Sequence, residues 1–336
     1  MSANPAFWEV FARAGNSKTW KLVTPPGVAD NGGLVAAPGG ASSLTVAVRP
    51  SQDLAFSPLA ATANGGGSWS TAGPIKAAVA ASPDALAATG RHLAALLSNG
   101  TIETSANGGT SWSVLAKPGA IAASPAAKAC DGTVRVTAVS VGLSSTEVLA
   151  GGTCGTGGTS ALFSHSAGKG WQRASLPVSG QLVRLTNGVA LVAGKSGLTA
   201  LLPTVSWYAY APLTGTPAPT ATAPSWTVSG PLPVSDPVTA SGTLALGSAW
   251  VLLPGGRAAT VGLTGATGAA APGGPQWLLL PPVPAHTAVL ASGPGGDTDA
   301  LAVSGSTLTV WQLPPLAKLW SKVQTISVPI QYGSSS

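Results

Sequence analysis

Charged side chains are scarce in this sequence of 336 residues: 8% are Asp, Glu, Lys or Arg, about a third of the usual share. That scarcity excludes long amphipathic helices, whose wet face needs Glu and Lys. No segment carries an apolar stripe of helical period with helix caps either. Gly and Pro are abundant instead, at 44 and 29 residues, and they favour short strands joined by turns. The composition predicts an all-β fold whose surface consists of Ser, Thr, Asn and backbone groups.

Basic residues do not cluster, although the formal net charge is +6. Because the sixteen Lys and Arg are scattered along the chain, the electrostatic footprint of a nucleic-acid-binding protein is missing, and no nucleic-acid partner is expected. Three basic pairs do flank tryptophans: Lys18/Lys21, Lys169/Arg173 and Lys318/Lys322. We interpret these pairs as protection of outer strands, whose free backbone edge a lysine shields from edge-to-edge aggregation.

Long apolar runs are missing as well. No stretch reaches the roughly 18 apolar residues of a transmembrane helix. The residues after Met1 show neither the basic nor the apolar region of a secretory leader. We expect an extracellular or cell-surface protein, seen as its mature or trimmed form, with an export signal or anchor outside this sequence.

Cysteine is limited to Cys130 and Cys154. Neither belongs to a CxxC pair or stands near a set of histidines, so no metal site and no cofactor are predicted. A disulfide and two free thiols are the alternatives, and we favour the disulfide. It would close a loop of about two dozen residues and stabilise the fold by about 3 kcal/mol.

Tryptophan recurs along the chain at a nearly regular spacing in sequence. Seven tryptophans begin a short apolar run that ends in Pro or Gly: Trp20, Trp69, Trp112, Trp171, Trp226, Trp277 and Trp320. Their mean separation is about 50 residues, a period typical of propeller blades and too long for most helical solenoids.

Each repeating unit divides into four apolar runs separated by short turns. In the unit that contains Trp112, these runs are 84–90, 92–97, 101–105 and 111–116. Four strands per unit and seven units predict a seven-bladed β-propeller, a single domain over residues 1–336. The Pro- and Thr-rich segment 211–225 is interpreted as a long loop inserted between two strands.

The two chain ends are expected to share a blade. The residues before Trp20 suffice for one strand and not for three, whereas those after Trp320 can supply an innermost strand. We therefore expect residues near Ile326 to Gln331 to pair with the segment Phe7 to Val23. N- and C-terminal strands would then close one blade, and with it the ring.

Similar polar turns precede three of the tryptophans. Thr62–Trp69 reads TANGGGSW, Ser105–Trp112 reads SANGGTSW, and Ser164–Trp171 reads SHSAGKGW. These segments resemble the Asp-box, or BNR, repeat, whose pattern is Ser-x-Asp-x-Gly-x-Thr-Trp, although each has lost the Asp. The matching positions are Thr62, Asn64, Gly66, Trp69, Ser105, Asn107, Gly109, Trp112, Ser164, Gly168 and Trp171. The resemblance to this sialidase- and sortilin-like superfamily implies a β-propeller in which the box joins the third and fourth strands of a blade.

We interpret the boxes as structural turns. Asn and Gly tolerate a positive φ, and a Ser or Asn side chain can bind the backbone N–H groups of its own turn. The Trp can pack beneath the turn. A phosphate-binding loop would instead have to open a helix, and no helix is expected to follow.

Function is expected at a mouth of the central channel, away from the boxes. The leading hypothesis is a non-catalytic binding or scaffold module, a monomer, that recognises a glycan or a protein partner there. The candidates are polar residues on loops next to innermost strands: Asp30, Asn31, Arg49, Asp53, Arg91 and Arg135. Plain turns remain the alternative for them. Tyr208 and Tyr210 could stack on a sugar ring, but packing between blades is the favoured interpretation.

Two other functions stay open. The resemblance includes sialidases, so a glycoside hydrolase or lyase is the runner-up; most such enzymes use paired carboxylates, and sialidases a Tyr nucleophile. Glu103 is expected on an outer strand, and Asp297 and Asp299 in a solvated turn, so no catalytic residue is predicted. The third function is an assembly factor similar to the photosystem II stability proteins, which resemble this repeat pattern.

Overall fold

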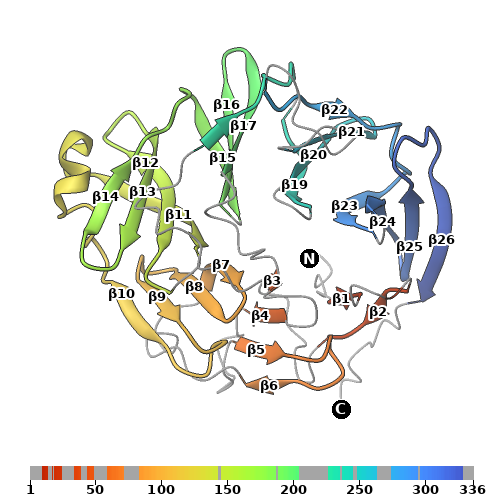
Figure 1. Cartoon of the computed structure of the whole chain (residues 1–336), viewed down its shortest axis with the longest axis horizontal. Coiled ribbons are helices and arrows are strands. Elements are labelled where there is room, and N and C mark those ends of the chain that lie inside the picture. Colours follow the sequence, from red (N-terminus) through yellow and green to blue (C-terminus); the bar gives the residue numbers. More distant parts are fainter. Residues whose placement is uncertain are drawn as a thin grey trace, which may run out of the picture.

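A computed structural model describes residues 10–13, 17, 19–24, 34–38, 44–48, 59–71, 83–142, 145–186, 188–203, 226–234, 237–244, 248–262, 274–293 and 296–327. Their strands form seven antiparallel sheets that stand side by side in a ring (Figure 1). Six of these sheets have four strands, and the N-terminal sheet shows two in the described part of the chain. The all-β fold and the seven blades predicted from the tryptophan spacing are confirmed.

Each four-stranded sheet follows the chain from its innermost strand to the rim (Figure 1). The first three sheets contain β1 (Phe11–Ala12) and β2 (Lys21–Leu22); β3 (Leu34–Pro38), β4 (Leu44–Val48), β5 (Leu59–Thr62) and β6 (Ser70–Thr71); and β7 (Pro83–Thr89), β8 (His92–Leu97), β9 (Ile102–Ser105) and β10 (Ser113–Ala116). The next two contain β11 (Val134–Val141), β12 (Val148–Cys154), β13 (Thr159–Ser166) and β14 (Gly170–Ala174); and β15 (Gln181–Thr186), β16 (Val189–Gly194), β17 (Gly197–Pro203) and β18 (Trp226–Val228). The last two contain β19 (Ala240–Thr243), β20 (Ala249–Leu253), β21 (Arg257–Val261) and β22 (Leu278–Leu279); and β23 (Thr287–Ser292), β24 (Thr298–Ser304), β25 (Thr307–Leu313) and β26 (Ser321–Ser327).

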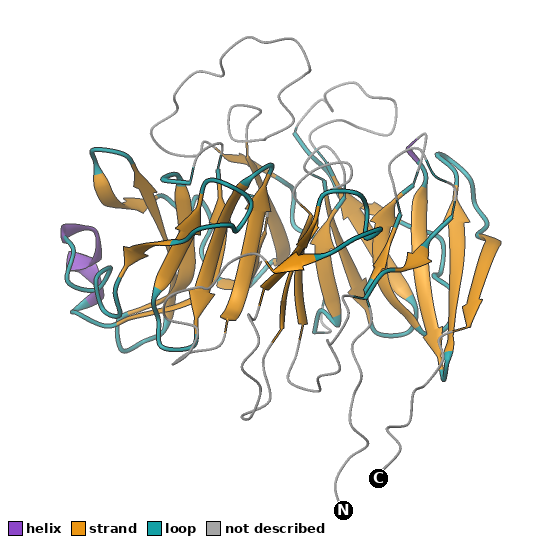
Figure 2. Ribbon diagram, turned by 90° about the horizontal axis from the view of Figure 1, so that it is seen from below, coloured by secondary structure: helices purple, strands orange, loops and turns teal. Residues whose placement is uncertain are grey.

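The apolar core consists of layers between neighbouring blades. The layer between the β7–β10 and β11–β14 sheets holds Leu96, Ile102, Val139 and Phe163, each at most 2% exposed. Similar layers follow around the ring toward β26. Because a blade is covered on both faces, its second strand is a continuous apolar run, as in β8, β16 and β20. Figure 2 shows these strands from the side, with the connecting turns gathered on the two faces of the ring.

Helix is minimal in the described residues. They contain the 3₁₀ helix η1 (Pro125–Cys130) on the long connection from β10 to β11. None of their helices is long and apolar enough to cross a membrane.

The prediction of ring closure is wrong for Ile326. This residue lies in β26 and pairs with Leu308 of β25, so it belongs to the rim strand of the last blade. The reason is length: β25 has seven residues, and a partner of equal length consumes the run Ser321–Ser327. Residues 328–331, the remainder of the expected closing strand, lie outside the described residues.

Side chains connect the N-terminal sheet to the last blade. The Arg13 guanidinium forms an ion pair of 2.5 Å with Asp299 on β24 and also donates to the carbonyl oxygen of Ser292. Trp20 donates from Nε1 to the same carboxylate at 3.0 Å. Gln324 of β26 exchanges two hydrogen bonds with the Trp20 backbone, at 2.8 and 2.9 Å, as a strand partner would. Asp299 is 1% exposed, so the expectation of a solvated turn is wrong for this residue.

Candidate functional site

The two well-preserved Asp-boxes are closed hydrogen-bond networks. Ser105 Oγ accepts the N–H groups of Asn107 and Gly109 at 3.3 and 2.9 Å, and Asn107 Oδ1 accepts that of Ser111 at 2.9 Å. The turn before Trp69 repeats the pattern through Thr62 and Asn64. Both turns join the third and fourth strands of a blade. Their side chains bind their own backbone, which supports a structural role.

The third box is a simpler hairpin. Gly168 and Gly170 have φ values of 74° and 64°, and the Trp171 ring packs against His165 with centroids 5.2 Å apart. Among the described residues, no hydrogen bond from the side chain of Ser164 or Ser166 accompanies this turn. The loss of the Asn, which holds the other two turns, explains the difference.

The channel-mouth candidates are not brought together by the described structure. Asp30, Asn31, Arg49 and Asp53 lie outside the described residues, as do Tyr208 and Tyr210. Arg91 is exposed in the turn after β7, where its carbonyl oxygen accepts the N–H of Gly108 in the Asp-box turn. Arg135 is exposed near the beginning of β11. β7 and β11 are equivalent innermost strands. Arg91 follows the end of β7, whereas Arg135 is near the start of β11, so the two arginines lie on opposite faces of the ring.

Bulges on innermost strands are a feature that was not predicted from the sequence. In four blades one extra residue interrupts the pairing with the second strand: Asp84, Thr137, Val183 and Ala288. All four are exposed. Arg184 follows the bulge in β15, and burial lowers the pKa of its guanidinium from the usual value. In the sequence, Arg184 is recognisable as a single cation between apolar residues, in QLVRLT.

A basic groove lies on the rim, between η1 and β14. It has a volume of about 660 Å³, and its lining includes Lys128, Lys169, Trp171 and Arg173. We call it the rim groove. The backbone positions explain the arrangement. Trp171 and Arg173 are two residues apart in β14, so their side chains lie on the same face of the strand. Lys169 directly precedes β14, and Lys128 belongs to η1. From the sequence, we had interpreted Lys169 and Arg173 as edge protection alone.

A disulfide holds the rim groove in shape. Cys130 at the end of η1 and Cys154 at the end of β12 are bonded, with Cα atoms 4.8 Å apart, which confirms the predicted pairing. Both cysteines are buried. Arg173 Nη1 lies 3.4 Å from each of the two sulfur atoms. The bond therefore fixes η1 against the sheet and positions Arg173 at the same time.

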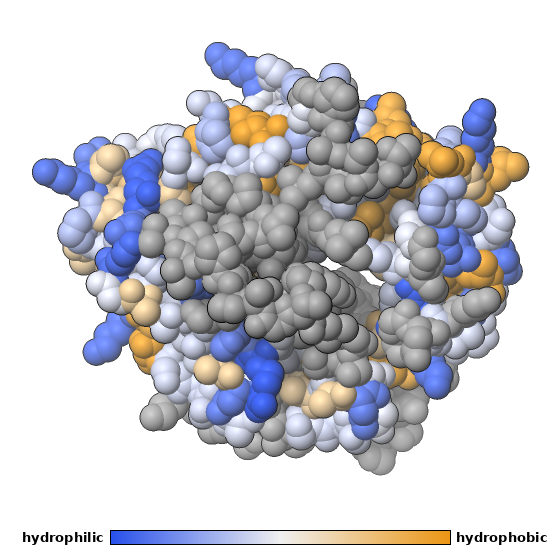
Figure 3. Space-filling model, viewed as in Figure 1, coloured by the Kyte–Doolittle hydropathy of each residue, from blue (hydrophilic) through white to orange (hydrophobic). Residues whose placement is uncertain are grey.

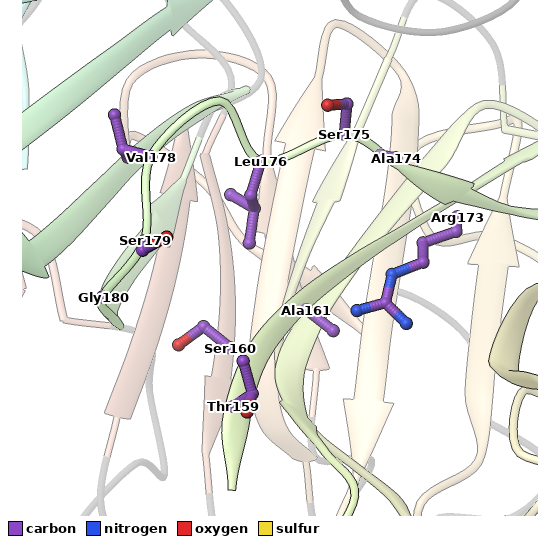
Figure 4. A pocket seen from close by; sticks show the side chains of 10 residues that line it. All are labelled: Thr159, Ser160, Ala161, Arg173, Ala174, Ser175, Leu176, Val178, Ser179 and Gly180. Carbon is purple, nitrogen blue, oxygen red and sulfur yellow. The ribbon is translucent and has the colours of Figure 1, made fainter. Parts of the chain in front are cut away.

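A second recess adjoins the rim groove on the other side of Arg173. It has a volume of about 490 Å³ and lies between β13–β14 and the connection to β15. Figure 4 shows the Arg173 guanidinium reaching in from one side, with Ser160 and Ser179 on the other. Arg173 is common to both hollows, so one guanidinium can serve a ligand that occupies either.

Positive charge dominates the rim groove. In the described part of the chain, the ion pair found is Arg13–Asp299, so no carboxylate there neutralises Lys128, Lys169 or Arg173. No group of three His, Cys, Asp or Glu side chains that could hold a metal ion occurs among these residues. The arrangement suits an anionic ligand, since cations and a tryptophan edge line a preformed space.

Comparison with known proteins supports the fold. No protein-family model matches the sequence, and no curated protein is significantly similar to it. Among solved structures, YCF48 from Cyanidioschyzon merolae is 11% identical with a TM-score of 0.50, over 88% of this chain and 92% of that one. Human WBSCR16 is 10% identical with a TM-score of 0.51, over 88% and 78%. A YCF48 bound to D1 peptide is 14% identical with a TM-score of 0.49, over 86% and 80%. At such identities, the likeness to the C. merolae YCF48 and to WBSCR16 shows the β-propeller fold alone.

Proposed function

We propose that this chain is a non-catalytic binding propeller, acting outside the cell or at its surface, that recognises a glycan or a protein partner. The observation that carries the proposal is the rim groove, where three cations and a tryptophan surround a space held by a disulfide. A volume of about 660 Å³ is in the range of small-molecule sites. The site we favour is therefore on the rim of the ring, away from the channel mouth.

The chemistry of the rim groove favours an acidic partner. Arg173 can bind a carboxylate or sulfate through two parallel N–H groups, and Lys128 and Lys169 add point charges. The half-buried Trp171 ring offers an apolar edge beside them. Both an acidic oligosaccharide and an acidic peptide segment meet these requirements.

The extracellular location is supported by the disulfide. Bonds between cysteines form and persist in oxidising compartments and are rare in the cytosol. The bond Cys130–Cys154 joins residues 24 apart in sequence and has no thiol competitor, because the chain has two cysteines in all. Secreted and cell-surface proteins fold in such an oxidising compartment.

The test is a binding screen with a groove variant. The full chain is applied to an array of sialylated, sulfated and neutral glycans, and to a fluorescent peptide of six glutamates. We expect binding to an acidic probe. The variant Lys128→Ala/Lys169→Ala/Arg173→Ala should weaken it by roughly tenfold or more, because hydrogen bonds to charged groups contribute about 1.5–3 kcal/mol each.

A charge-matched control variant is Lys21→Ala/Lys195→Ala/Arg257→Ala, which removes three exposed cations that belong to other blades. It should bind as the wild type does. Retention of binding by the groove variant, with loss in Arg91→Ala/Arg135→Ala, would move the site to the channel. Absence of binding to every acidic probe would contradict the proposal.

No observation on the described residues specifically favours the other two functions, a glycoside hydrolase or lyase and an assembly factor. Glu103 is 1% exposed within β9, and Asp299 is bound to Arg13. A hydrolase would need carboxylates that a substrate can reach. The likeness to YCF48 is one of fold, so it does not favour an assembly factor over another binding protein.

A further inference from the structure

A second surface, distant from the rim groove, exposes apolar side chains. It consists of Leu278, Leu279, Leu316, Leu319 and Val323, which are 54%, 66%, 79%, 79% and 47% exposed. We call it the leucine rim. Figure 3 shows apolar surface at the upper right edge of the ring, where Figure 1 places β22 and the beginning of β26. Clusters of exposed large apolar residues mark interaction sites in soluble proteins.

Leu316 occupies a backbone conformation that is unfavourable for a leucine. It occupies the turn between β25 and β26, closed by a hydrogen bond of 3.1 Å from Ala317 N to Pro314 O. Its φ of 64° lies in the left-handed region, which glycine adopts freely and a leucine adopts only with strain. A glycine would form this turn more easily and expose less apolar surface. The leucine at this position thus combines an unfavourable backbone conformation with a large exposed apolar side chain.

The leucine rim is presented by a rigid support. Trp320 donates from Nε1 to the carbonyl oxygen of Pro281 at 3.2 Å, which ties the start of β26 to the segment that follows β22. A bulge in β26 makes Val323 the extra residue opposite Val310 and Trp311, and it is exposed at the edge. Two neighbouring blades thus hold their apolar residues along one stretch of rim.

Lysines flank the exposed leucines. Lys318 stands directly before Leu319, and Lys322 directly before Val323. Both are exposed, and neither forms an ion pair within the described residues. Leucine side chains enter the boundary of the acyl chains, while lysines nearby bind anionic headgroups. A symmetric dimer through the same surface would bring the lysines of two copies together, which disfavours self-association.

We propose that the leucine rim attaches the protein reversibly to an anionic lipid surface. Leu316 and Leu319 insert between the headgroups, and Lys318 and Lys322 bind the lipid phosphates. The attachment is independent of the rim groove, which lies on another blade across the ring (Figure 1).

Vesicle flotation of the full chain tests the proposal. Vesicles of phosphatidylcholine alone are compared with vesicles containing about one-third phosphatidylserine, which carry a negative surface potential. We expect the wild type to float with the anionic vesicles. Leu316→Ser/Leu319→Ser should reduce the bound fraction by roughly tenfold or more, because it removes the buried apolar area. Lys318→Glu/Lys322→Glu should abolish the preference for anionic lipid.

Two variants serve as matched controls. Val303→Ser changes an apolar residue that is 49% exposed and lies outside the leucine rim. Lys117→Glu/Lys195→Glu changes the net charge by the same amount as Lys318→Glu/Lys322→Glu. Both should float as the wild type does, and circular dichroism checks that all variants fold. Failure of the wild type to bind anionic vesicles, or full binding by the double serine variant, would overturn the proposal. So would a wild-type dimer in sedimentation that the serine variant loses, since the rim would then join two copies.

Discussion

Ser105 shows how one hydroxyl can organise a turn. It accepts two backbone N–H groups and donates to Asn107 Oδ1 at 2.9 Å, while it is 2% exposed itself. We predict that Ser105→Ala lowers the free energy of unfolding by about 2 kcal/mol, because two N–H groups lose their acceptor in a buried place. Chemical denaturation followed by tryptophan fluorescence measures the change.

The equivalent change in the third box is the control. Ser164 occupies the same position and is 4% exposed, but its turn lacks the hydrogen-bond network among the described residues. Ser164→Ala should therefore alter the free energy of unfolding by less than about 0.5 kcal/mol. If the free energy of unfolding falls equally in both variants, the effect of Ser105→Ala cannot be assigned to its hydrogen-bond network.

Single residues also show where sequence reasoning stops. The boxes could be recognised because Ser105, Asn107 and Gly109 are close in sequence and bind one another. Asp299 could not be assigned, because its partner Arg13 is 286 residues away and nothing local distinguishes a paired aspartate from a solvated one. The rim groove was missed for the same reason, since Lys128 reaches β14 only through the fold.

At the scale of the element, the bulge in β11 depends on Gly152 in its partner strand, β12. Thr137 is the extra residue, and the pairs on either side of it are Val136–Gly152 and Ala138–Gly151. A Cβ atom on Gly152 would stand 1.9 Å from the carbonyl oxygen of Arg135, a backbone atom that cannot turn aside. Glycine is thus required where the bulged strand approaches.

We predict that Gly152→Ala lowers the free energy of unfolding by about 3 kcal/mol or prevents folding, because overpacking against backbone forces the strands apart. Gly157→Ala is the control: it lies in the turn after β12, and a Cβ atom there would meet nothing within 4 Å. Thermal unfolding compares the two variants with the wild type. If Gly152→Ala leaves the free energy of unfolding unchanged, β11 and β12 can move apart without loss of stability.

The elements were predictable where their pattern is local. Tryptophan spacing and short apolar runs gave the number of blades, because each blade repeats the same four strands. The last strand was misplaced because a run such as SKVQTISV fits an inner or an outer strand equally well. Pairing with the seven residues of β25 decides between them, and no property of the run itself carries that information.

At the scale of the whole molecule, the two proposed surfaces lie on different sides of the ring. Figure 1 places β14, which borders the rim groove, on the left, and β26, which carries part of the leucine rim, on the right. A protein attached to lipid through β22 and β26 would direct the rim groove away from the membrane. The groove would then be accessible to a soluble or cell-surface partner, so the two proposals are compatible in space.

The integrity of the ring depends on the contacts that join its first and last sheets. The Arg13 and Asp299 side chains are 8% and 1% exposed, and Gln312 also donates to Asp299, at 3.3 Å. We predict that Asp299→Asn lowers the free energy of unfolding by about 3–5 kcal/mol, because a buried guanidinium loses its counter-charge. Hydrogen exchange should rise in residues 10–13 and 19–24 before it rises in the other blades.

A double variant separates the charge from the contact. Arg13→Met/Asp299→Leu removes both charges and keeps apolar volume, and replacement of a buried ion pair by apolar residues is often neutral. Trp20 Nε1 and Gln312 still lose their acceptor, so the double variant should recover only part of the stability that Asp299→Asn loses. If the single variant unfolds as the wild type does, with unchanged exchange in the N-terminal sheet, the ring is held together elsewhere. If the double variant is as unstable as the single one, the lost hydrogen bonds outweigh the stranded charge.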